Sequence, residues 1–101
     1  MASQFDVTID PEASWQTKGN SVAESGVFEK LDGVRDIKAF KGVFITNLDP
    51  AAGENLGIRY DGTGGSYALT PGTTIFLEVR HPAKIRVVGS QGQVLYSWLA
   101  Y

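Results

Sequence analysis

The feature that most constrains this chain is a series of short apolar segments over residues 42–101, separated from one another by glycine or proline. Residues 42–49, 55–62, 66–69, 74–80, 84–90 and 93–101 are rich in β-branched and aromatic side chains. Several of these segments alternate apolar and polar residues, the pattern of strands with one buried face. Short strands at near-regular spacing predict an all-β fold, an antiparallel β-sandwich or small barrel.

The connections carry turn signals of their own. Thr70-Pro71-Gly72-Thr73 predicts a type II turn, because proline presets φ at the second position and glycine accepts a positive φ at the third. His81-Pro82 predicts a corner before the next strand, and Gln91-Gly92 predicts a tight turn before the last one.

The first third of the chain lacks this regularity. Residues 4–10 alternate, with Phe5, Val7 and Ile9 on one side, and predict a strand that Pro11 ends. Residues 12–36 show no sustained period, so we expect an irregular arm there rather than a short helix over 21–31. We therefore expect an N-terminal strand and arm in residues 1–36 and a compact β-sandwich in residues 37–101.

Charge divides along the same line. Residues 1–36 hold seven acidic and three basic side chains, whereas residues 37–101 hold four acidic and six basic ones. Such asymmetry suits an arm that docks on a neighbour, or two solvated surfaces of one domain. The 101-residue chain has no cysteine, which excludes disulfides and thiolate metal sites. Neither a signal peptide nor a membrane-spanning apolar run is expected.

The last strand is apolar on both sides. Val94, Tyr96, Trp98 and Ala100 form one face, whereas Leu95, Leu99 and Tyr101 form the other, interrupted by Ser97. A strand with one wet face has polar residues on that side. We expect the second face to be covered by the N-terminal segment or by another subunit, for which large aromatic side chains are good anchors.

The glycine-rich stretch DGTGGS, residues 61–66, is the clearest candidate for a chemical site. It lacks the third glycine of a dinucleotide fingerprint, where Tyr67 stands instead, and the lysine of a phosphate-binding loop. One carboxylate, Asp61, makes a poor calcium site unless other chains supply ligands. We interpret the stretch as a hairpin turn.

Other chemistries are also weakly supported. His81, the one histidine, has no recognisable nucleophile or acidic partner, and nothing in the sequence pairs Glu78 with Asp61 as glycosidase carboxylates. Basic residues beside tyrosines permit single-strand nucleic-acid binding, but the net charge of −2 argues against it. We expect no catalysis and no cofactor or metal.

Residues 43–101 resemble small structural proteins of tailed-bacteriophage virions. The shared pattern includes VFITNL, NLGIRYDG, LTPGTTIFL and KIRVVGSQG, followed by an aromatic last strand. It is carried by structural positions: Leu69, Pro71, Gly72, Ile75, Leu77, Lys84, Ile85, Val87 and Gly89. The resemblance implies an antiparallel β-sandwich on the particle, either a capsid decoration protein or another head or tail accessory.

The resemblance also implies partners. A decoration protein assembles in the host cytoplasm, binds the major capsid protein and neighbouring copies of itself, for example as a trimer, and ends up in the virion. On this reading we expect Trp15, Val27 and Phe28 of the arm to contact the capsid. Leu95, Leu99 and Tyr101 are then the expected self-association residues. The alternatives are a tail or head–tail accessory with a receptor- or glycan-binding role, or a single-strand nucleic-acid-binding barrel.

Overall fold

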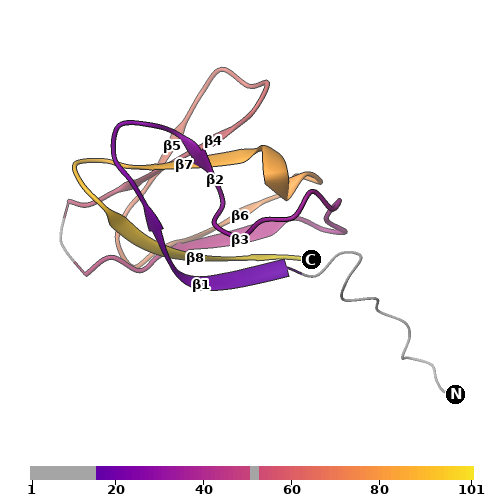
Figure 1. Cartoon of the computed structure of the whole chain (residues 1–101), viewed down its shortest axis with the longest axis horizontal. Helices are drawn as coiled ribbons and strands as arrows, with labels where there is room; N and C mark the ends of the chain where they lie inside the picture. Colours follow the sequence, from indigo (N-terminus) through magenta and orange to yellow (C-terminus); the bar gives the residue numbers. More distant parts are fainter. Residues whose placement is uncertain (1–15, 51–52) are drawn as a thin grey trace, which may run out of the picture.

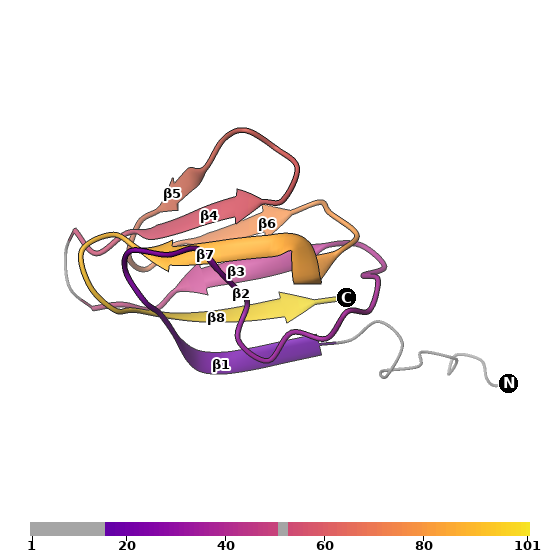
Figure 2. The same ribbon diagram turned by 45° about the horizontal axis from the view of Figure 1, so that its top comes forward.

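Two antiparallel four-stranded sheets face each other in the computed structural model, which describes residues 16–50 and 53–101. The strands are β1 (Gln16–Ala23), β2 (Glu29–Lys30), β3 (Val43–Asn47), β4 (Leu56–Tyr60), β5 (Tyr67–Leu69), β6 (Thr74–Leu77), β7 (Ile85–Gly89) and β8 (Val94–Ala100), with a 3-10 turn η1 (Pro82–Lys84) before β7. Sheet I has the order β1-β8-β3-β6, and sheet II has the order β2-β7-β4-β5. Figure 1 shows them as two layers, and Figure 2 shows the strands of sheet I side by side. The predicted all-β sandwich is confirmed.

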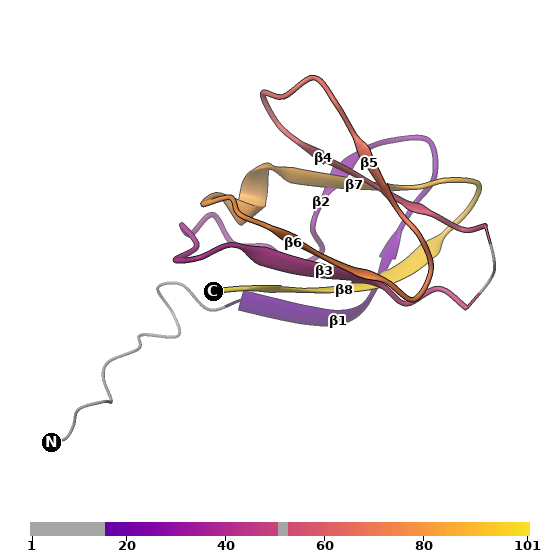
Figure 3. The ribbon, with the colours of Figure 1, turned by 180° about the vertical axis from the view of Figure 1, so that it is seen from behind.

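The chain passes repeatedly between the layers. Among the described strands, only β4 and β5 follow each other within one sheet, and they form a hairpin that projects from the sandwich in Figure 3. The predicted type II turn is confirmed: Gly72 has a φ of 79° and the Thr73 N–H donates to the Thr70 carbonyl at 3.2 Å. This turn and Gln91-Gly92 both carry the chain from sheet II to sheet I.

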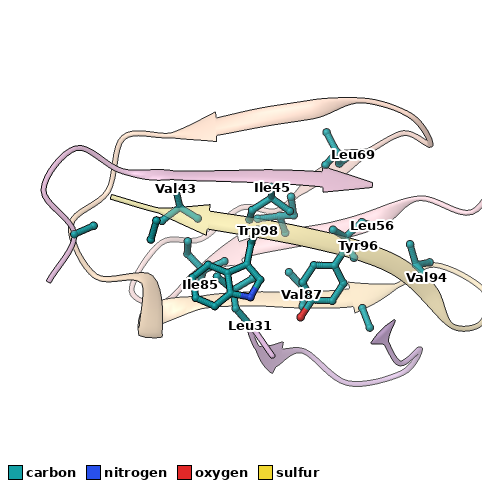
Figure 4. Close-up of a cluster of buried hydrophobic side chains, with 14 residues drawn as sticks. Leu31, Val43, Ile45, Leu56, Leu69, Ile85, Val87, Val94, Tyr96 and Trp98 are labelled. Carbon is teal, nitrogen blue, oxygen red and sulfur yellow. The ribbon is translucent and has the colours of Figure 1, made fainter. Parts of the chain in front are cut away.

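The core forms where the inward sides of the two sheets meet. Alternation places every second residue of β8 inward, from Val94 to Ala100, and all four are buried. Sheet II supplies Leu56, Ile58, Ile85 and Val87 from β4 and β7. Figure 4 shows Tyr96 and Trp98 of sheet I together with Leu56, Ile85 and Val87 of sheet II between the two layers. The core thus depends on the period of two that the sequence predicts.

The irregular arm expected over residues 12–36 is corrected for the part that the structure describes. Residues 16–23 form β1, which pairs antiparallel with β8 from Gln16–Ala100 to Ala23–Val94. The register shifts between Lys18 and Ser21, where Asn20 has a positive φ of 54°. Among the described strands β1 lies at an edge of sheet I, and a bulge at a sheet edge is a common way to discourage further strand pairing. Trp15 and the expected strand at 4–10 lie outside the described residues.

The segment after β2 is held against the core by side chains of sheet I. The buried Trp98 indole N–H donates to the Asp32 carbonyl at 2.9 Å, and the Asp32 N–H donates to the Tyr96 hydroxyl at 2.8 Å. The Gln16 side-chain amide similarly exchanges two hydrogen bonds with the Arg35 backbone. Both polar groups of the Asp32 backbone are therefore satisfied from inside the sandwich, and Leu31 is buried beside them (Figure 4).

Removing either aromatic hydrogen bond should destabilise the fold. Tyr96→Phe leaves the Asp32 N–H without its partner, and Trp98→Phe does the same to the Asp32 carbonyl. Each lost hydrogen bond should cost about 0.5–1.5 kcal/mol of unfolding free energy, because both bonds are only part-buried and Asp32 is exposed. Trp98→Phe should cost more, because it also removes buried volume from the core. Denaturant unfolding of the two variants measures this. A cost near zero for both would show that water replaces the lost bonds.

The Tyr96 phenol should also make stability depend on alkaline pH. Burial raises its pKa above the usual 10.0, the Asp32 N–H opposes that shift, and the negative charges of Asp32 and Glu29 add to it. Because the unfolded chain loses this proton first, the stabilisation is complete below about pH 10 and is lost as pH rises through the folded-state pKa. Unfolding free energies from pH 8 to 11 should fall more steeply for the wild type than for Tyr96→Phe. Parallel profiles would contradict the assignment.

Candidate functional site: the two outer faces of the sandwich

The outer face of sheet I carries an exposed aromatic cluster. Phe44 and Phe76 are cross-strand partners on β3 and β6, with ring centroids 4.7 Å apart. Tyr101 lies 6.1 Å from Phe44 and stacks nearly parallel to it, at an interplanar angle of 9°. Leu99 is the partner of Phe44 on the other side, on β8. Phe44 and Phe76 remain 37% and 39% exposed, so the cluster presents a ready apolar surface.

A band of hydroxyl groups runs beside this cluster. Ser97, Thr46 and Thr74 are in register across β8, β3 and β6, and the Thr46 and Thr74 hydroxyls lie 2.7 Å apart. Together with Thr17 of β1, these side chains and Phe44 line a surface hollow of about 310 Å³. Beyond the hydroxyl band, Leu95 pairs with the exposed Val22. The outer face is therefore banded: aromatic, hydroxyl, then aliphatic.

Leu95, Leu99 and Tyr101, expected from the sequence to mediate self-association, all belong to this outer face. Each is half-buried rather than covered. β1 lies beside β8 in the same sheet, so residues 16–23 do not fold over the apolar second side of the last strand. Phe44 and Phe76 were not among the surface residues predicted from the sequence. Their outward direction follows from the alternation of β3 and β6, but their meeting with Tyr101 depends on strand order.

The outer face of sheet II gathers different side chains. Phe28 lies over Gly57 of β4, where an added Cβ would stand 3.9 Å from the Phe28 ring and only 2.8 Å from Val88. The Arg59 guanidinium lies 4.1 Å from the centre of the Phe28 ring, a cation–π contact. Val27, next to Phe28, is 54% exposed. Phe28, one of the three expected capsid contacts, thus lies on the opposite side of the sandwich from Leu99 and Tyr101.

Cationic side chains form a row on this second face. Lys30, Arg86 and Arg59 are in register across β2, β7 and β4. Arg86 makes an ion pair with Asp61 at 2.7 Å and also donates to the Ala83 and Ile85 carbonyls. Asp61 therefore fixes Arg86 in place and offsets part of the positive charge of the row.

The DGTGGS stretch is the turn of the β4–β5 hairpin, as expected. Ile58 pairs with Tyr67 at its base, Gly62 has a φ of 90°, and the Thr63 hydroxyl donates to the Tyr60 carbonyl at 2.6 Å. Within residues 16–50 and 53–101, no three histidine, aspartate or glutamate side chains come together as metal ligands. The glycines thus serve the chain reversal.

Two further features complete the surface. Where the edges of the sheets separate between β5 and β6, an open hollow of about 330 Å³ is lined mainly by Ile58, Tyr60, Tyr67, Leu77 and Val79. His81 occupies the expected corner, and its carbonyl accepts the Lys84 N–H that closes η1. In the part of the chain that the structure describes, no helix is long and apolar enough to cross a membrane.

Comparisons with protein-family models, curated proteins and solved structures find no match to this chain. Its function must therefore be argued from the chemistry of the two outer faces.

The hairpin interpretation predicts insensitivity to calcium. Addition of 5 mM CaCl2, about 10³ times the dissociation constant of a typical calcium sensor, should leave the melting temperature unchanged. Addition of EDTA should also leave it unchanged. Asp61→Asn should lower the unfolding free energy by only about 0–1 kcal/mol, because the Arg86–Asp61 pair is partly exposed. A calcium-dependent rise in melting temperature that Asp61→Asn abolishes would contradict this interpretation.

Proposed function

We propose that this chain is a non-enzymatic structural protein of a phage particle, a capsid decoration protein that binds and stabilises the assembled head. The observation that carries the proposal is the exposed aromatic cluster on the outer face of sheet I. Rigid aromatic side chains at the centre of an apolar patch are typical anchors of protein–protein interfaces. The resemblance of residues 43–101 to virion proteins supplies the class of partner.

The arrangement of the faces supports a bridging role. A sandwich with contact residues on both outer sides can hold one neighbour on each, and the two sets lie on different sheets. The residues of one side are Phe44, Leu99 and Tyr101, and Phe28 belongs to the other, next to the exposed Val27. A protein that binds only the assembled shell stabilises it by mass action, by about 2.7 kcal/mol per site at a hundredfold excess over the dissociation constant.

The first test is to purify particles from the native source on a density gradient and count copies of this protein by mass spectrometry. Hundreds of copies per particle support decoration of the head. A few copies per particle indicate a connector or tail component instead. Its absence from every particle fraction would overturn the proposal.

The aromatic cluster can be tested by rebinding to stripped particles. Phe44→Ser with Tyr101→Ser should remove the stacked pair and reduce bound copies at least tenfold, the effect of losing about 1.4 kcal/mol or more at an interface anchor. Tyr67→Ser is the matched control, because Tyr67 is an exposed aromatic residue outside this cluster. Equal rebinding by both variants would exclude the outer face of sheet I as the contact.

A glycan-binding role at a tail tip is a second candidate, favoured by one observation. The hollow on sheet I combines the Thr17, Thr46, Thr74 and Ser97 hydroxyls with the Phe44 ring. Hydroxyl groups donate and accept hydrogen bonds as a sugar requires, and an aromatic wall accepts its apolar side. This role predicts saccharide binding by the isolated protein that Thr46→Val reduces, and few copies per particle.

A further inference from the structure

The cationic row of sheet II forms a surface of defined chemistry. Neighbouring strands lie about 4.8 Å apart, so Lys30, Arg86 and Arg59 fall within roughly 10 Å. Asp61 offsets one of these charges. Glu29 does not join the row: it is in register with Val87 rather than with Arg86, and although it is exposed on the short strand β2, its charge acts on Tyr96. The row therefore retains net positive charge.

An apolar row lies next to the cationic one. This row consists of three residues in register across β7, β4 and β5: Val88, Gly57 and Ala68. Val88 and Gly57 each lie two residues along their strand from the Arg86–Arg59 pair. Phe28 lies over Gly57. An extended segment that follows the boundary between the two rows directs alternate side chains to each. A segment bound at this boundary must therefore have acidic side chains on one side and apolar side chains on the other.

The first fifteen residues of this chain have that composition. They contain Asp6, Asp10 and Glu12 and no lysine, arginine or histidine. Within residues 5–10, apolar Phe5, Val7 and Ile9 alternate with Asp6, Thr8 and Asp10. Asp6 and Asp10 are four residues apart, about 13 Å in an extended chain, close to the length of the cationic row. Charge and spacing on both partners thus agree.

We propose that residues 5–10 of one copy bind the outer face of sheet II of a second copy, with Asp6 and Asp10 on the cationic row. Docking within one chain would need residues 11–15 to be almost fully extended, so exchange with a second copy requires less stretching of the chain. Residues 11–15 span at most roughly 17 Å, whereas the path from Gln16 in sheet I must cross the ~10 Å between sheets and pass round an edge. Reciprocal exchange between copies gives a closed assembly.

The inference specifies how copies contact one another within the proposed function, and it exchanges the two roles expected from the sequence. The face of sheet I with Leu99 and Tyr101 then contacts the head, and the face of sheet II with Phe28 contacts the neighbouring copy.

The inference is tested on isolated protein without any particle. Its failure therefore leaves head binding untouched, and failure of head binding leaves it standing. Two full-length charge-reversal variants are needed. One is Lys30→Glu with Arg59→Glu, and the other is Asp6→Lys with Asp10→Lys. All four positions are polar, and Lys30 and Arg59 are exposed, so both variants should fold.

Sedimentation velocity measures the outcome. The wild type should self-associate, and its affinity should fall as salt rises, because the contact is largely electrostatic. Each variant alone should associate at least about tenfold more weakly, since like charges then face each other. An equimolar mixture of the two should associate again, because every exchanged contact pairs opposite charges once more.

The control is Lys41→Glu with Arg80→Glu, which changes the net charge equally at exposed positions away from the row and should leave association unchanged. Three results would overturn the inference. One is a wild type that stays monomeric at every concentration. Another is equal weakening by the control. The third is a mixture that remains monomeric although circular dichroism shows both variants folded.

Discussion

The two hydrogen bonds that hold the Asp32 backbone are the constraint on which the rest of the sandwich depends. Tyr96 and Trp98 project from sheet I into the core, and their polar ends meet the N–H and the carbonyl of the same residue. Buried tyrosine and tryptophan usually need such partners. Here the partner is Asp32, in the segment between β2 and β3. The two hydrogen bonds therefore join β8 of sheet I to the chain that follows β2 of sheet II.

This arrangement decides the character of both sides of β8. The inward side uses its aromatic residues for the core and for Asp32, and it is fully buried from Val94 to Ala100. The outward side, with Leu95, Leu99 and Tyr101, is left half-exposed beside Phe44. The core therefore explains why the inward side of β8 is apolar, but it does not explain why the outward side is apolar too. In the proposed function, this outward side contacts a partner.

The sequence predicted the strands whose buried residues are large and apolar, because alternation marks them directly. It missed β1, whose inward positions Gln16, Ser21 and Ala23 are polar or small. That strand forms because β8 supplies its pairing partners and because the Gln16 side chain holds the Arg35 backbone, contacts separated by 84 and 19 residues of chain. Periodicity within a segment cannot reveal bonds of that range.

The residues of the candidate surfaces also fall into those that a single segment predicts and those that only the folded structure brings together. Leu99 and Tyr101 were predicted from one strand alone, because their excess of apolar character is local. The Phe44–Tyr101 stack and the Arg59–Phe28 contact join residues from separate segments and depend on strand order, which local patterns do not specify.

The two outer faces differ in chemistry, and this difference affects which partner each face can bind. Sheet I presents aromatic and hydroxyl groups with little charge on the strands themselves, so shape and apolar burial determine what it binds. Sheet II presents Lys30 and Arg59 beside Phe28, so charge selects its partner. A copy that approached with the wrong face would bury cations against an aromatic surface without the carboxylates that compensate their desolvation. In the proposed function, opposite faces with unlike chemistry would orient the protein between two different neighbours.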